Sequence, residues 1–168
     1  MSKHCYDKWW LRKDMENMGY IFEYCDKYCK NLFGVDIDKL KFLNAFMVSN
    51  LRLEMETGHE RLLSQSGQDS VRMFVEVDCD NDINQFKVTK DTRTNYKDHQ
   101  LYWVGWMYAY LHFKQYILSS ELVKILPIEL MLEHYYLGHE MSKEVYFEHI
   151  KNVFEDYSLK EEHQNEKA

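Results

Sequence analysis

The fold is decided by the stretch Tyr102-Trp103-Val104-Gly105-Trp106-Met107-Tyr108-Ala109-Tyr110. The helix that contains it is expected to run from about Asp98 to Tyr116 and is apolar around most of its circumference, which is typical of a helix at the centre of a domain. Gly105 has no side chain and lets another backbone come close. The sequence therefore predicts a central buried helix around which the rest of the chain packs.

Two amphipathic helices are predicted before this segment. Apolar residues recur three and four positions apart from Asp14 to Phe33, and Gly34 follows as a stop. A second pattern of this kind begins after Asp38, whose side chain can cap a helix, and continues to about Thr57. We expect these two helices to pack as a hairpin on one side of the central helix.

The segments on either side of the central helix carry weaker signals. Val71 to Val77 is rich in β-formers, so it fits a strand as well as a short helix, and Asp78 to Asp98 has no sustained period and is predicted to be a long exposed loop. After the central helix, Ser119-Ser120 can cap a short helix, Pro127 suits the first turn of the next, and Ser142 can cap the last. We expect these three helices on the other side of the central helix.

Length and composition predict one all-α domain. The chain has 168 residues, of which 45% are hydrophobic and 15% aromatic, so it is long enough for one sizeable core. One Pro and 6 Gly are too few for the many turns of an all-β protein. The prediction is a compact single-domain helical bundle of about five to seven helices over residues 1–158, followed by a polar disordered tail at residues 159–168.

The charge and the absence of certain segments limit the classes of function. The formal net charge of −7 argues against a protein that binds nucleic acid through clustered cations. We also expect no membrane contact, because no run is apolar enough to cross a bilayer, and the amino end lacks the pattern of an export signal. The four cysteines fit reduced thiols better than disulfides. These features predict a cytoplasmic protein without a cofactor.

A family resemblance is carried by Arg52–Glu60, Ser64–Asp69, Tyr102–Trp106 with Tyr108 and Tyr110, Ser119–Leu122, and His139–Glu140. These segments resemble the acidic-Gly turn, the Ser-Gly cap, the Tyr-Trp-x-Gly-Trp helix and the Ser-x-Glu helix start of a family of small uncharacterised proteins from Gram-positive, often gut-dwelling, bacteria. The resemblance covers roughly residues 51–150. It implies an accessory protein of the kind that is encoded beside toxin-like or defence genes, and it carries over no functional residue.

An acidic turn and a pair of tryptophans are the predicted contact surface for a partner. Asp78, Asp80 and Asp82 follow one another at alternate positions, and Trp9 and Trp10 stand in a charged amino-terminal segment. Aromatic anchors with a charged rim make an effective protein interface. We therefore expect a protein-binding accessory factor of the antitoxin, immunity or inhibitor type, which masks a basic or toxin-like partner.

The same acidic turn imitates the first half of a calcium loop. The imitation fails at Ile83, which occupies the position that needs Gly, and at Thr89, where a bidentate Glu should stand. A solvated acidic loop is the better interpretation of this segment.

Histidines and glutamates in the carboxyl-terminal third offer an alternative function. His134, His139 and Glu140 belong to residue types that bind metals or move protons. However, His134 and His139 are five positions apart with Gly138 between them, so they do not share a helix face as the ligands of a zinc protease do. A metal-dependent hydrolase or nuclease is the alternative, and a DNA-binding regulator is disfavoured by the acidic composition.

Overall fold

The structure is a computed structural model that describes residues 5–89 and 95–167. Helices make up 77% of the chain, and the described residues contain no strand beyond one isolated bridge between Ile37 and Lys87. The predicted all-α fold is confirmed. None of the helices in the described ranges has the length and apolar character needed to cross a membrane.

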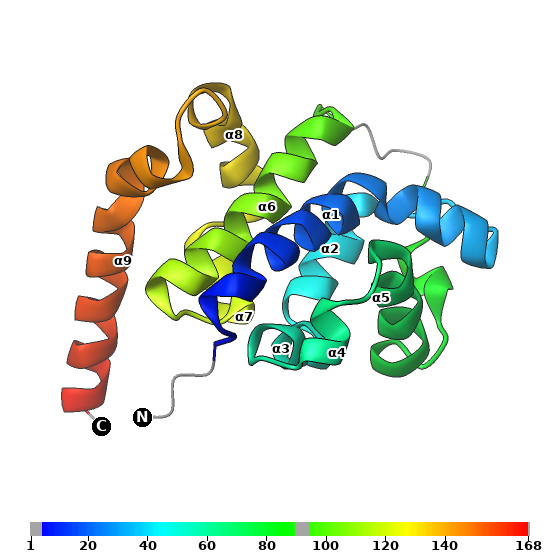
Figure 1. Cartoon of the computed structure of the whole chain (residues 1–168), viewed down its shortest axis with the longest axis horizontal. Coiled ribbons are helices and arrows are strands. Elements are labelled where there is room, and N and C mark those ends of the chain that lie inside the picture. The colour runs from blue at the N-terminus through cyan, green and yellow to red at the C-terminus, as the bar shows by residue number, and fades with distance from the viewer. Residues whose placement is uncertain (1–4, 90–94, 168) are drawn as a thin grey trace.

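Nine α-helices follow one another in the described part of the chain (Figure 1). They are α1 (Leu11–Phe33), α2 (Lys39–Met47), α3 (Asn50–Glu56), α4 (Glu60–Leu63), α5 (Gly67–Met73), α6 (Asp98–Gln115), α7 (Ser119–Ile125), α8 (Ile128–Gly138) and α9 (Lys143–Glu166). Three shorter turns accompany them, namely the 3-10 helix η1 (Lys8–Trp10), the π-helix η2 (Phe74–Asp78) and the 3-10 helix η3 (Ile83–Phe86).

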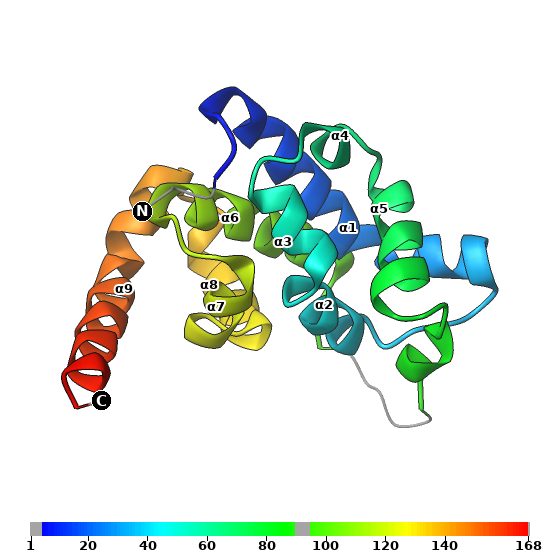
Figure 2. The same cartoon turned by 90° about the horizontal axis from the view of Figure 1, so that it is seen from below.

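Helix α6 is the predicted aromatic helix, and its most extensive contact is with α1. Gly105 makes this contact possible, because a Cβ atom at that position would overlap the backbone oxygen of Met18 and the ring of Phe22. The predicted close approach at Gly105 is thus confirmed. In Figures 1 and 2 α6 lies between α1 on one side and the carboxyl-terminal helices on the other.

The second predicted helix is in fact two helices. Ser49 ends α2 by donating a hydrogen bond from its Oγ to the carbonyl of Phe46 (2.7 Å), and it caps α3 by accepting one from the N–H of Arg52 (3.1 Å). The predicted hairpin is also only part of the arrangement, because α1 packs less on α2 than on α6 and α5. Breaks of this kind raise the number of helices above the predicted five to seven.

The segment from Val71 to Val77 forms no strand. Ser66 caps α5 by accepting a hydrogen bond from the N–H of Asp69 (3.1 Å), and the chain continues into η2. The apolar side chains of Val71, Phe74 and Val75 are buried at helical spacing. Burial of one helix face therefore overrides the β propensity of these residues.

The predicted exposed loop after Asp78 is partly packed into the core. Ile83 and Phe86 are buried on η3, and the ring of Phe86 lies 5.2 Å from that of Phe42. The rest of the loop includes residues 90–94, which lie outside the described residues.

The carboxyl-terminal third follows the prediction at Ser142 and departs from it elsewhere. Ser142 caps α9 by accepting a hydrogen bond from the N–H of Val145 (3.2 Å), as expected. Ser119 is not the cap of α7, because its side chain is buried against other helices. Where the sequence predicts a polar disordered tail, the structure continues α9 as helix to Glu166 with exposed side chains from Leu159 on. Local backbone hydrogen bonds and side-chain pairs four residues apart, such as Tyr157 with Glu161, hold that part of the helix.

Candidate functional site

The acidic turn that is predicted to contact a partner has two different roles. The carboxylate of Asp78 accepts hydrogen bonds from the N–H groups of Asn50 (3.0 Å) and Leu51 (3.1 Å). It therefore satisfies backbone donors at the start of α3 and places a negative charge at the positive end of that helix. Asp80 and Asp82 are exposed. Only these two of the three acidic residues present their carboxylates to a partner.

The two tryptophans pack against each other at the surface just before α1. Trp9 is 74% exposed, and the centre of its ring lies 5.1 Å from that of Trp10. Trp10 is partly buried against the core, and both residues belong to η1, so their positions are fixed by regular backbone. A large exposed ring held beside an anchored one is the type of side chain that protein interfaces bury.

The two parts of the predicted contact surface do not lie together. The tryptophans precede α1 at its amino-terminal end, whereas the acidic turn follows α5 and η2. Figures 1 and 2 place these two regions on different sides of the molecule. One compact partner surface would therefore meet one of them and not both.

The histidines of the alternative site do not converge. The Nδ1 atom of His134 lies 2.8 Å from the hydroxyl oxygen of Tyr146. Burial lowers the pKa of His134. His139 is exposed, and its ring stacks on that of Tyr135 with 4.3 Å between the ring centres. Glu140 is exposed beside it. Within residues 5–89 and 95–167, no three His, Cys, Asp or Glu side chains are placed to hold a metal ion.

Four polar side chains, none of which is predicted from the sequence to belong to a site, form a buried cluster. This polar cluster consists of Asp14 from α1, Arg52 and Glu56 from α3, and Ser119 from α7. The guanidinium of Arg52 donates two hydrogen bonds to Asp14, at 2.7 and 3.0 Å, and one to the Oγ of Ser119 at 3.0 Å. Ser119 in turn donates to Glu56 from its Oγ (2.5 Å) and from its N–H (2.9 Å). Each group thus bonds another member of the cluster.

The ionisation of the cluster is fixed by these contacts. Burial alone would raise the pKa of Asp14, but the charge of Arg52 and the hydrogen bonds from Arg52 and Tyr6 outweigh burial and lower it. Burial would likewise lower the pKa of Arg52, but the two carboxylates raise it. The cluster is therefore a charged network whose members stabilise one another in a low-dielectric interior.

The polar cluster resembles a catalytic site in composition and differs from one in geometry. His112 is buried next to it and contacts the carbonyl of Ile117 through Nδ1 (2.7 Å) and that of Glu56 through Nε2 (3.2 Å). Ser119 donates to Glu56 and not to His112. The thiol of Cys5 lies 3.5 Å from Nε2 of His112, but burial raises the pKa of this thiol to about 11, which disfavours the thiolate that a cysteine nucleophile needs. Asp14, Arg52 and Ser119 have no exposed surface. The arrangement joins α1, α3 and α7 and presents no group to a substrate.

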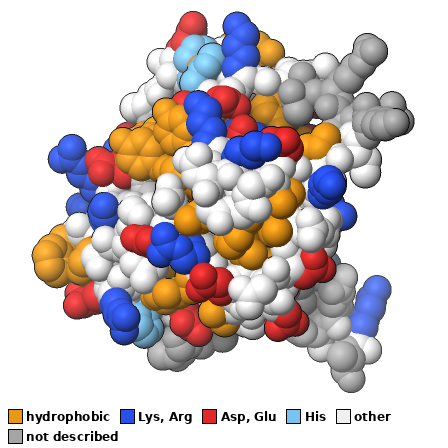
Figure 3. Space-filling model, turned by 90° about the vertical axis from the view of Figure 1, so that its right-hand side faces the viewer, with side chains coloured by type: hydrophobic (Ala, Val, Ile, Leu, Met, Phe, Trp, Pro, Cys, Tyr) orange, Lys and Arg blue, Asp and Glu red, His pale blue; other side chains and the backbone are white. Residues whose placement is uncertain are grey.

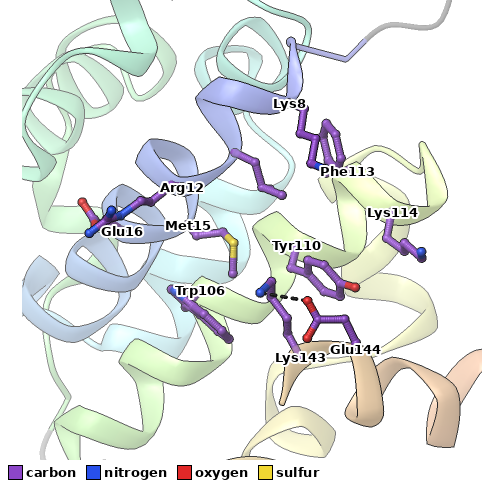
Figure 4. A pocket seen from close by; sticks show the side chains of 11 residues that line it. Lys8, Arg12, Met15, Glu16, Trp106, Tyr110, Phe113, Lys114, Lys143 and Glu144 are labelled. Atoms are coloured by element: carbon purple, nitrogen blue, oxygen red, sulfur yellow. Dashed lines mark hydrogen bonds and ion pairs between the residues drawn. The ribbon is translucent and has the colours of Figure 1, made fainter.

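An open groove lies between the start of α1, the middle of α6 and the start of α9. Its volume is about 660 Å³, and Figure 4 shows Met15, Trp106 and Tyr110 turned toward the same opening. Its apolar lining consists of Leu11, Met15, Trp106, Tyr110 and Phe113. We call this feature the basic groove, because its charged lining is mostly cationic.

The charged lining of the basic groove is opposite in sign to the whole chain. It consists of Lys8, Arg12, Glu16, Lys114, Lys143 and Glu144, which give a net charge of two positive, against −7 for the chain. No pattern in the sequence predicts this site, since its residues come from three separate segments of the chain, at 8–16, 106–114 and 143–144. The sequence contains one hint of the groove. The aromatic residues Trp106, Tyr108, Tyr110 and Phe113 are more than one buried face of α6 can hold, so some of their rings must lie near the surface.

The face of the molecule that carries α5 and the carboxyl-terminal end of α1 has no charged patch of one sign. Figure 3 shows acidic, basic and hydrophobic side chains mixed over this face. A mixed surface offers no broad field of one sign, so attraction of a charged partner to this face depends on individual side chains.

Comparisons with protein-family models, with curated proteins and with solved structures found no match to this chain. The family resemblance drawn from the motifs therefore stays a prediction.

Proposed function

We propose that this protein is a protein-binding accessory factor that acts by masking a partner, as an antitoxin, immunity protein or inhibitor does. The observation that carries the proposal is the exposure of Trp9, which is 74%, in a residue whose neighbour Trp10 is anchored on the core. Trp9 and Trp10 place two large rings side by side, and aromatic anchors supply much of the energy of protein interfaces.

The acidic residues Asp80 and Asp82 support a second contact of the same function. Both side chains are exposed. They belong to a tight backbone turn in which Asp80 and Asn81 have positive φ angles of 50° and 62°. A basic partner would be attracted to the carboxylates of this turn, which form no ion pair within residues 5–89 and 95–167. It forms a separate surface from the tryptophan pair, so each surface needs its own variant.

The test is affinity capture of the tagged chain from its native cytoplasm at moderate salt, followed by metal analysis of the captured protein. We expect one stoichiometric partner, whose amount falls by about tenfold or more for Trp9→Ala, since loss of an interface anchor costs about 2 kcal/mol or more. Tyr136→Ala is the matched control, because Tyr136 is a similarly exposed ring (65%) on α8.

Two further variants separate the surfaces. Asp80→Asn with Asp82→Asn tests the acidic turn, and Asp78 is left unchanged because it caps α3. A partner that is captured equally by all the variants would contradict both surfaces. A chain that carries stoichiometric metal and no partner would contradict the proposed function itself and favour the hydrolase alternative at His134, His139 and Glu140.

A further inference from the structure

The basic groove has a floor that can receive an apolar side chain. Met15 and Tyr110 are buried (4% and 5% exposed) but still line the opening, while Trp106 and Phe113 are partly buried around it. Aromatic rings and a flexible thioether adapt well to an inserted side chain. The groove's volume of about 660 Å³ falls in the range of sites that enclose a small ligand or a partner's anchor residue.

The charges around the groove leave two cations without a carboxylate. Arg12 pairs with Glu16 at 3.2 Å, and Lys143 pairs with Glu144 at 3.0 Å, as Figure 4 shows for the latter pair. Lys8 and Lys114 are exposed and have no carboxylate partner in the part of the chain that the structure describes. The ammonium of Lys114 lies 5.6 Å from the centre of the Phe147 ring, and its charge helps to lower the pKa of Glu148 without forming an ion pair with it.

The groove and the tryptophan pair use neighbouring residues of the chain. Lys8 and Leu11 line the groove, and Trp9 and Trp10 stand between them on η1. The two tryptophans do not themselves line the groove, so binding at the groove and binding at Trp9 can be tested by separate variants.

We propose that the basic groove binds an acidic segment of the partner protein, with an apolar side chain inserted between Trp106, Tyr110 and Met15 and carboxylates placed on Lys8 and Lys114. The inference rests on the proposed protein-binding function and adds the chemistry of the partner. Charge complementarity favours a carboxylate-bearing peptide, since opposite potentials attract across an interface. Two unpaired cations are few for a nucleic-acid backbone, which is bound through many phosphate contacts.

A random 12-residue peptide display library, selected on the full chain, tests the proposal with a defined probe. We expect the selected peptides to share an aromatic or aliphatic residue flanked by Asp or Glu. Their affinity, measured by titration calorimetry at moderate salt, should fall roughly tenfold for Lys8→Gln with Lys114→Gln, because two charge pairs with the peptide are lost.

The matched control is Lys30→Gln with Lys124→Gln, which makes the same change in net charge at exposed lysines outside the groove. Equal affinity for both double variants would overturn the groove assignment, as would selection of basic or uncharged peptides. Tight binding of single-stranded oligonucleotides that depends on Lys8 and Lys114 would overturn it in favour of nucleic acid.

The same experiment distinguishes the failure of this inference from the failure of the proposed function. Peptides whose binding depends on Trp9 or on Asp80 and Asp82, but not on the groove lysines, would leave the protein-binding function in place and overturn the groove. A selection that yields no binding peptide would overturn the groove, while the capture experiment with Trp9→Ala would decide the function independently.

Discussion

The polar cluster around Arg52 and the basic groove around Trp106 both include residues from the amino-terminal half of α1, but they differ in chemical character. The cluster holds Asp, Glu, Arg and Ser within hydrogen-bond distance, but those side chains are fully buried and bond one another. The groove holds lysines and aromatic rings, which perform little chemistry alone, but it is open and its charges are incompletely paired. Residue types that suggest catalysis are thus used here to hold helices together, and ordinary surface residues form the accessible site.

This difference shows that a binding site is recognised by how accessible its side chains are and whether their charges are paired, more than by which residue types it contains. A buried charge that is paired and hydrogen-bonded contributes to the specificity of the fold, and removing one partner leaves the other uncompensated. An exposed charge near an apolar opening costs the fold almost nothing and is free to bind a partner.

Replacing Arg52 gives the largest expected effect. Arg52→Met removes the only cation of the polar cluster and leaves the carboxylates of Asp14 and Glu56 buried without it. We expect the free energy of unfolding, measured by urea denaturation, to fall by about 3–5 kcal/mol.

Arg72→Met is the matched control for Arg52→Met. Arg72 is a half-buried arginine that pairs with Asp69 at 3.1 Å at the surface of α5, so its loss should change the free energy of unfolding by no more than about 0.5 kcal/mol. Equal losses for the two variants would show that the cluster adds nothing beyond a surface ion pair, and the contrast between the two regions would disappear.

Acid pH gives the next effect, through Asp14. Because its pKa is lowered in the folded protein, the unfolded chain takes up a proton first as the pH falls, and stability decreases from about pH 4, the ordinary range of this carboxyl, down through the folded pKa. Asp14→Asn removes the charge permanently and should cost roughly 2–3 kcal/mol at neutral pH, as for a hydrogen bond to a charged group.

The difference between the wild type and Asp14→Asn should therefore shrink as the pH falls. Urea unfolding at a series of pH values from neutral to acid measures this difference directly. A gap that stays constant across the series would mean that the charge of Asp14 does not stabilise the fold, which would break the account of the polar cluster.

The sequence predicts the central elements of the fold and the ends of several helices because those features depend on local patterns. Gly34 at the end of α1 has a φ of 69°, and the caps at Asp38 and Ser142 use side-chain oxygens within three residues. The break at Ser49 also had a local signal, a serine at a cap position, but the apolar period continues across it and conceals the break.

The polar cluster and the basic groove were not predictable in the same way. Arg52 and Glu56 stand four apart on α3, which is usual for an exposed ion pair, and only the fold brings Asp14 and Ser119 to them. The groove likewise depends on how α1, α6 and α9 cross. Contacts between residues far apart in the chain leave no period or motif in a single sequence, so their position becomes visible only in three dimensions.

The smallest expected effect on stability comes from changes in the groove, in contrast to the large effect expected in the polar cluster. Lys8→Gln with Lys114→Gln should change the free energy of unfolding by less than about 0.5 kcal/mol, because both lysines are exposed and neither pairs with a carboxylate in the described ranges. Urea denaturation of this double variant and of Arg52→Met under the same conditions compares the free energies of unfolding that the two regions contribute. A loss near 2 kcal/mol would mean that these charges support the fold, and a fall in peptide binding would then report unfolding. A negligible loss together with weaker peptide binding would assign the two lysines to the partner, because residues that the fold does not need are then the ones that binding requires.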